Sequence, residues 1–405
     1  MSDRQSSSSS SAKESSGPPT ASTFFRKLRD KVVEPFTSIN QQQSGKHLPG
    51  SIVRTRSKED VKPVATVAVE RKQLPLKLQQ FAQILSEEDI DLVALKKLSW
   101  NGIPAQYRPM VWQLLLGYVP TNKSRRDAII ARKRKDYRDS VATYFTSLEG
   151  ESGLGDRTSH EGETMRQIKV DLPRTSPDTP FFQQPPIQRI MERILYIWSI
   201  RHPASSYVQG INDLLTPVLL VCMSAFVPDA LRCDVIALES SEDILQSVEA
   251  DAYWCLTKLL DYMQDHYTSS QPGLQRMVMR LEDLVHRVDN ELHTHISQEG
   301  VLFMQFAFRW MNCLLLRELP LACILRLWDT YLSEERSGFE HFHVYVCTVL
   351  LIKYKAPLLR MDFTEMLTFL QDLPTGTWNE ESVEPILSQA FVYSTLFEDS
   401  PSHLR

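Results

Sequence analysis

The stretch LSEEDIDLVALKKLS, residues 85–99, carries the first clear helix signal in this chain of 405 residues. Ser86 stands before the acidic run Glu87–Asp89, and a serine followed by acidic residues is typical of a helix N-terminus. Apolar residues between Ile90 and Leu98 then recur at the spacing of one helix face. The stretch therefore predicts a helix that starts after Ser86 and buries one side.

The same apolar periodicity continues along the chain. It predicts helices over residues 107–118, 125–145, 187–200, 213–224, 241–264, 274–290, 301–316, 319–331, 342–354 and 363–370. No convincing strand-like alternation and no repeat of fixed length accompanies these segments. The sequence thus predicts an all-α fold, with a single helical domain over residues 76–405.

Residues 1–75 differ from this domain in composition, with a serine tract at Ser6–Ser11 and few aliphatic side chains. Such a segment buries too little apolar area to offset chain entropy, so we expect a disordered tail. Within it, Phe24–Val33 has the spacing of a short basic amphipathic helix for a membrane surface or a partner groove, or is plain disordered chain. Ser57, in the basic string RTRS, is a candidate phosphorylation site for a phosphoserine reader.

Two irregular stretches interrupt the predicted helices. Residues 149–167 are rich in glycine, serine and charge, which predicts a flexible, solvated insertion. Residues 171–186 contain five prolines, which exclude regular helix while keeping the backbone stiff. A stiff, non-helical segment in a helical scaffold is a suitable platform for a functional side chain.

Charge and cysteine content narrow the class of protein. The 45 Lys and Arg against 50 Asp and Glu give a formal net charge of −5, which argues against a nucleic-acid partner. The six cysteines lie in apolar, helical surroundings without close pairs, as expected for reduced thiols that act as small hydrophobes. No signal peptide and no transmembrane run is visible, so we expect a cytoplasmic protein with at most peripheral membrane contact.

The common catalytic signatures are missing. The sequence has no P-loop, nucleophile elbow, H-E-x-x-H, C-x-x-C or dinucleotide fingerprint. His293 and His295, like His341 and His343, stand two positions apart in expected helices, where side chains do not share a face. We therefore expect no metal site and no cofactor of the protein's own.

Two short segments, residues 168–175 and 205–213, combine polar side chains with proline or glycine. IKVDLPRT, residues 168–175, places a carboxylate and a proline just before Arg174, and SSYVQGIND, residues 205–213, places Gln209 beside a glycine at a helix start. By residue type alone, a loop arginine is most often a solvated cation, and a glutamine at a helix start is most often a local hydrogen bonder. From residue types alone, a functional role for Arg174 and Gln209 is therefore less favoured than these ordinary structural roles.

These strings resemble the two signature motifs of the TBC domain of Rab GTPase-activating proteins. Ile168-x-x-Asp171-x-x-Arg174 and Tyr207-x-Gln209-Gly210 match them in order and separation. The segment YRPMVW at 107–112 resembles the opening R-x-x-x-W motif of that family, and LRLWDTY at 325–331 resembles its later tryptophan-aspartate helix. Within the family, the sequence at residues 207–217 and 133–137 is most similar to the member 22 type and to a related yeast Golgi Rab activator.

The resemblance implies two packed helical subdomains that bind a Rab GTPase in its GTP form. Arg174 is then an arginine finger and Gln209 a glutamine finger that orients the attacking water, while the Rab itself holds GTP and Mg²⁺. The chain is thereby expected to be an enzyme activator and not itself an enzyme, acting at the Golgi or another endomembrane. The alternative is a non-catalytic scaffold that holds Rabs or Golgi adaptors, with the tail as a recruiting segment.

Supporting roles follow for other residues of the matched motifs. Asp171 is expected to position the Arg174 loop, and Tyr207 with Gly210 to shape the Gln209 turn. Arg108 and Trp112 of the opening motif are expected to be structural, as are Trp328 and Asp329 of the later one. Thr175 and Asn212 stay open between a structural role and contact with the nucleotide or the Rab.

Overall fold

A computed structural model describes residues 66–145, 160–235, 241–268, 270–335 and 338–397. The chain divides into two compact units, Met1–Val61 and Lys62–Arg405, and all described residues belong to the second. The predicted amphipathic segment at 24–33 and the candidate phosphorylation site Ser57 lie outside the described residues.

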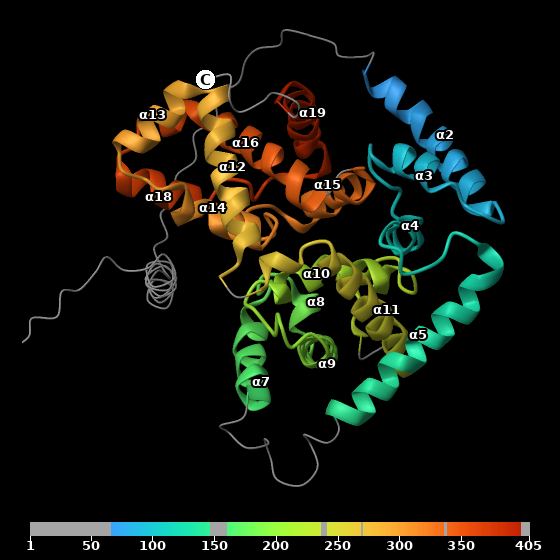
Figure 1. Ribbon diagram of the computed structural model, residues 1–405. Helices are drawn as coiled ribbons and strands as arrows, with labels where there is room; N and C mark the ends of the chain where they lie inside the picture. The colour runs from blue at the N-terminus through green and yellow to red at the C-terminus, as the bar shows by residue number, and fades with distance from the viewer. Residues whose placement is uncertain (1–65, 146–159, 236–240, 269, 336–337, 398–405) are drawn as a thin grey trace, which may run out of the picture. The chain divides into compact units, whose positions relative to one another are not determined.

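The described part is helical throughout and forms no named strand (Figure 1). Its α-helices are α2 (Thr66–Ser86), α3 (Leu92–Ser99), α4 (Arg108–Leu115), α5 (Arg126–Ser140), α7 (His160–Asp171), α8 (Pro180–Gln183), α9 (Pro185–Arg201), α10 (Ile211–Ser224), α11 (Ser241–Asp261), α12 (Pro272–Val288), α13 (Asn290–Gln298), α14 (Phe303–Asn312), α15 (Leu321–Ser333), α16 (His343–Lys353), α17 (Lys355–Leu358), α18 (Phe363–Gln371) and α19 (Glu380–Phe397). Short 3-10 or π turns are η2 (Lys123–Arg125), η3 (Val141–Phe145), η4 (Leu172–Arg174), η5 (Ala230–Arg232), η7 (Gln264–His266) and η8 (Gly338–Phe342). The all-α prediction is confirmed.

The helices pack in two groups. In the first, α9 lies against α7 and α11, and α11 lies against α5 and α10. In the second, α12 lies against α14 and α16, and α19 lies against α15 and α16 (Figure 1). Helix α10 joins the groups, because it also contacts α4 and α15. Contact on several sides explains why every residue from Ile211 to Met223 is buried, and why this run is mostly apolar after Asp213.

The predicted cap at Ser86 is wrong, because α2 continues to that residue and α3 starts only at Leu92. Asp91 caps α3 instead, with Oδ1 accepting hydrogen bonds from the backbone N of Val93 at 2.8 Å and of Ala94 at 3.2 Å. The intervening segment pairs with a distant loop, since the backbone N of Ile90 donates to the carbonyl of Thr121 at 3.3 Å. That long-range pairing overrides the local serine signal.

Three predicted boundaries also differ from the structure. Helix α2 begins at Thr66, within the expected tail, and α7 occupies residues 160–167 of the expected flexible insertion. Met165 and Ile168 face inward from α7, so helix formation buries apolar area there. Pro180 and Pro185 open α8 and α9, where a missing N–H costs nothing, so the prolines do not exclude helix at these points.

The cysteines and the apolar helices are the subject of two expectations from composition. All six cysteines are free, and five of them are buried. No helix in the described part of the chain is both long and apolar enough to cross a lipid bilayer.

Candidate functional site

The Arg174 loop begins where α7 ends. The chain passes from Asp171, the last residue of α7, into the 3-10 turn η4, whose last residue is Arg174. Pro173 lies within this turn, and Thr175 leaves it in an extended conformation. The Arg174 side chain is 46% exposed.

Asp171 is the anchor of this loop. Its carboxylate is 1% exposed and accepts hydrogen bonds from Arg174 Nε at 3.0 Å, Gln167 Nε2 at 3.2 Å and Tyr207 OH at 2.9 Å. Arg174 Nη2 contacts the same carboxylate oxygen as Nε. A buried carboxylate requires such compensation, because losing water without partners is costly. The Asp171 carboxylate thus binds one edge of the Arg174 guanidinium and both neighbouring polar side chains.

A chain of hydrogen bonds joins the two loops. The Tyr207 hydroxyl lies within hydrogen-bond distance of both Asp171 Oδ2, at 2.9 Å, and Asn212 Oδ1, at 3.1 Å. Asn212 Nδ2 donates to Thr175 Oγ1 at 2.8 Å, and Thr175 Oγ1 donates to the carbonyl of Asp171 at 2.9 Å. The polar groups of both motifs thus form one connected network.

Burial decides the open question on Thr175 and Asn212. Both residues are fully buried, and their side chains bind each other. Their burial and their mutual hydrogen bond favour a structural role within the network. Burial, with the nearby Asp171 carboxylate, also raises the pKa of Tyr207, so its hydroxyl keeps its proton and acts as a donor.

Gly210 has the backbone conformation that the Gln209 turn needs. Its φ of +114° is rarely adopted by residues with a side chain, and a Cβ built here would lie 2.4 Å from Asn312 Nδ2. Asn312 Nδ2 donates to the carbonyl of Gln209 at 3.0 Å. The group that approaches this glycine is therefore the side-chain amide of Asn312.

Gln209 itself is half-buried. Its backbone carbonyl is held by Asn312, whereas its carboxamide forms no hydrogen bond with any described residue. The site thus combines a half-exposed guanidinium at Arg174 with an uncommitted carboxamide at Gln209. Neither end group is sealed in the interior, so both remain accessible to another molecule.

The remaining residues of the predicted site lie elsewhere. Arg108 Nη2 bonds Asp329 Oδ2 at 3.0 Å, Trp112 Nε1 donates to Asp329 Oδ1 at 2.7 Å, and the backbone N of Ile103 donates to Oδ2 at 2.8 Å. Trp112 stacks on Trp328 with ring centroids 5.9 Å apart. None of these bonds extends to the two loops in the described structure. This second cluster joins α4 to α15 through buried contacts.

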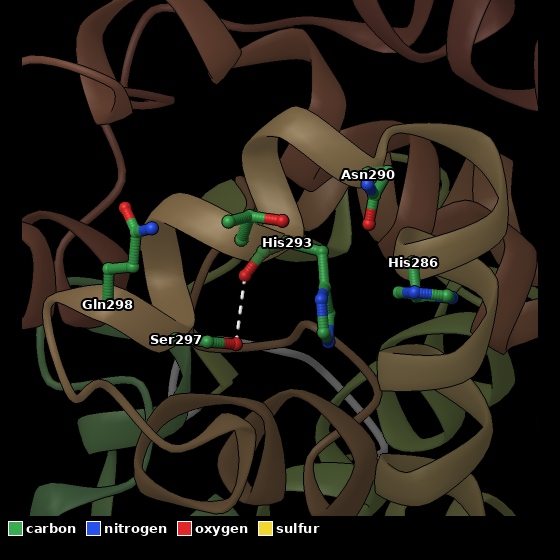
Figure 2. A pocket seen from close by; sticks show the side chains of 6 residues that line it. His286, Asn290, His293, Ser297 and Gln298 are labelled. Carbon is green, nitrogen blue, oxygen red and sulfur yellow. Dashed lines mark hydrogen bonds between the residues drawn. The ribbon is translucent and has the colours of Figure 1, made fainter.

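The two histidine pairs considered from sequence do not form paired ligand sets in the structure. His293 lines a pocket on α12 and α13, and its ring lies edge-to-face with the ring of His286, with centroids 4.9 Å apart (Figure 2). His295 instead bonds the carbonyls of Leu358 and Met361. His343 is buried between Tyr331 OH, 2.9 Å from Nδ1, and the Trp310 carbonyl, 3.1 Å from Nε2.

One other group of potential metal ligands was not predicted. Oxygen or nitrogen atoms of Asp265, His266 and Glu340 lie within 4.8 Å of one another. Arg276 contacts the Asp265 carboxylate, and Glu340 Oε1 lies 3.2 Å from His266 Nε2. Arg276 thus offsets the charge of the Asp265 carboxylate within this group.

The chain is similar to a known family and to several known proteins. Residues 105–359 match the family described as the Rab-GTPase-TBC domain. The chain is 49% identical to human TBC1 domain family member 22B over 331 residues, which is 81% of this chain and 63% of that protein. It is 44% identical to the GTPase-activating protein gyp1 of Schizosaccharomyces pombe over 344 residues, or 84% of this chain and 65% of that protein.

Solved structures give the same relationship. The crystal structure of the Ypt/Rab-GAP domain of Gyp1p superposes with a TM-score of 0.73 and 43% sequence identity, covering 80% of this chain and 99% of that one. The chain spans somewhat less than two thirds of the length of the relatives described above.

Proposed function

This chain belongs to the Rab-GTPase-TBC domain family, and we propose that it accelerates GTP hydrolysis by a Rab GTPase through Arg174 and Gln209. The observation that carries the proposal is the network around Asp171, Tyr207 and Asn212, which fixes both loops while leaving the two end groups accessible.

Arg174 would stabilise charge in the transition state. Phosphoryl transfer leaves little covalent work for a protein, so the rate depends on neutralising charge on the phosphoryl oxygens and on aligning the attacking water. A guanidinium is planar, permanently charged and able to donate several hydrogen bonds in one plane. An arginine finger in other GTPases is worth about 10³–10⁵ in rate, or roughly 4–7 kcal/mol of barrier.

Gln209 would orient the attacking water. A carboxamide carries both a donor and an acceptor, so it can bind a water molecule and a neighbouring carbonyl at once. The carboxamide is not consumed by bonds within the described structure, which leaves both functions available. The relatives named as GTPase-activating proteins favour this assignment over a binding role alone.

The chain would act as an activator, with GTP and Mg²⁺ bound by the partner. Nothing in the two loops resembles a phosphate cradle of its own, since both loops present single side chains and not a run of backbone N–H groups. We also propose that the protein works at the Golgi or another endomembrane, where a membrane-attached Rab would be its substrate.

A hydrolysis screen tests the proposal. The full chain is mixed with a panel of GTP-loaded Rabs, and phosphate release is followed under single-turnover conditions. We expect at least one Rab to respond, and Arg174→Lys to lose most of the stimulation because an ammonium cannot reproduce the planar fork. Arg232→Lys, at an exposed arginine of η5, is the matched control and should retain it.

The outcome also separates an activator from a scaffold. A scaffold would bind GTP-loaded Rab without changing the hydrolysis rate, and Arg174→Lys would then have no rate to lose. Wild-type stimulation by Arg174→Lys on every responding Rab would show that Arg174 is not the finger.

A further inference from the structure

Asn312 contacts the Gln209 turn from a distant part of the chain. It is the last residue of α14 and is 8% exposed. Its Nδ2 donates to the carbonyl of Gln209 at 3.0 Å, across 103 positions of sequence. A side-chain amide facing a backbone carbonyl can donate only through its NH₂ group, so the contact fixes which way the amide is turned. The Oδ1 atom of Asn312 is buried and has no hydrogen-bond partner among the described residues.

The backbone of Asn312 is itself held firmly. Tyr267 OH donates to the Asn312 carbonyl at 3.2 Å. Two fully buried residues follow shortly, Leu314 and Leu315, with φ values of +49° and +62°. Successive left-handed residues other than glycine are costly and persist only where the surrounding packing imposes them. The end of α14 is thus held in place by its own contacts, so Asn312 would not shift along with a displaced Gln209.

The segment that follows α14 also contacts the start of α10, through Cys313 and Arg317. Arg317 Nε donates to Asp213 Oδ2 at 3.0 Å, and Cys313 Sγ lies 3.5 Å from that oxygen. Burial acts to lower the pKa of Arg317, but the Asp213 carboxylate, together with Cys313 and Glu318, raises it overall, so the guanidinium stays charged. Residues on both sides of Gly210 are therefore fastened to one turn of the second helix group.

Close packing leaves no slack between these contacts. A Cβ at Gly210 would lie 2.4 Å from Asn312 Nδ2, so the amide rests directly on the glycine backbone next to Gln209. Since the carboxamide of Gln209 has no bond of its own in the described structure, its starting position depends on the backbone that carries it. Errors of about 1 Å in such positioning can cost about 10²-fold in rate.

We propose that Asn312 is a positioning residue, which holds the backbone of Gln209 so that its carboxamide meets the attacking water. This inference rests on the proposed function for its kinetic consequence. Asn312 does not touch the partner or the reacting atoms in this assignment. It acts through Gln209, and its removal matters only while Gln209 is present.

The first test needs no partner. Asn312→Leu keeps a similar volume and removes the donor, and Met311→Leu, a buried neighbour that keeps all hydrogen bonds, is the matched control. We expect amide hydrogen exchange at Gly210 and Ile211 to become at least fivefold faster in Asn312→Leu and to stay within twofold in Met311→Leu. Unchanged exchange at these amides in Asn312→Leu would overturn the proposal.

The second test is a double-mutant cycle with a Rab that responds to the wild-type chain. Loss of one positioning hydrogen bond should lower kcat about tenfold with KM within twofold. In a Gln209→Ala background, Asn312→Leu should cause no further loss of kcat. An equal loss in both backgrounds, or a change confined to KM, would assign Asn312 to general packing or Rab binding and refute a role through Gln209.

The two tests keep two failures apart. If no Rab responds to the wild-type chain, the proposed function fails, and hydrogen exchange alone decides whether Asn312 fixes the turn. If Rabs respond and the cycle is additive, the proposed function stands and the inference about Asn312 falls.

Discussion

Arg174 is held by Asp171, three residues earlier in the chain, with Nε 3.0 Å from Oδ1 and Nη2 in contact with the same oxygen. Nη1 of Arg174 forms no hydrogen bond within the described structure. One edge of the guanidinium therefore orients the side chain while the other edge stays available. Because the Asp171 carboxylate is buried and the guanidinium is half-exposed, the pair presents the charge outward from a fixed base.

Asp171→Asn should weaken this hold without removing the side chain's shape. A charge-assisted hydrogen bond is worth about 1.5–3 kcal/mol, so its loss predicts a fall of about tenfold or more in kcat for stimulated hydrolysis. Asp178→Asn, at an exposed position of the same loop, should leave kcat unchanged. Single-turnover phosphate release measures both, and wild-type kcat in Asp171→Asn would contradict the positioning role.

Gly210→Ala should both strain the backbone and displace Asn312. We expect the free energy of unfolding to fall by about 2 kcal/mol and stimulation of hydrolysis to fall more than tenfold. Gly117→Ala is the matched control, because Gly117 also has a positive φ, of +69°, but, its chain neighbours aside, no atom of the described residues lies within 4 Å of its added Cβ. Urea unfolding and kinetics on both variants separate the strain from the contact. Equal effects in the two variants would show that the Asn312 contact is unimportant.

Arg108→Met should affect stability alone. It leaves the buried Asp329 carboxylate without its cation, and breaking a buried pair costs about 3–5 kcal/mol. Burial raises the pKa of Asp329 even with Arg108 present, so the carboxylate depends strongly on its donors. Kinetics on the folded fraction should give a kcat within twofold of wild type. A large loss of kcat at full folding would place Arg108 in the functional site after all.

The sequence predicted what depends on nearby residues. Helix periodicity over α9, α10, α12 and α15 is local, and the two loop motifs lie close to the residues they bind. The sequence did not predict contacts between distant segments: Asn312 is one of several polar residues in α14, with Gln305 and Arg309, and has no local signal for a contact 103 positions away. The Ser86 cap failed for the same reason, since pairing with Thr121 sets where α3 begins.

His343 should make the fold sensitive to acid. The imidazole is fully buried, and burial lowers its pKa to about 4. The hydrogen bond to the Trp310 carbonyl raises the pKa but is outweighed, and nearby His266 adds to the decrease. In the unfolded chain the pKa of histidine is about 6.5, so the unfolded state binds a proton first as the pH falls. Stability from His343 is therefore complete above pH 6.5 and is lost as the pH drops from about 6.5 toward 4.

The expected size follows from the same two pKa values. Between pH 7.5 and pH 5 the shift amounts to about 1.5 pH units, or about 2 kcal/mol at 1.36 kcal/mol per unit. Urea unfolding at both pH values should show a smaller loss in His343→Gln than in the wild type, because glutamine does not titrate. His160→Gln, at an exposed histidine, is the control and should keep the wild-type difference. If His343→Gln kept it too, His343 would not be the buried neutral group that the structure describes.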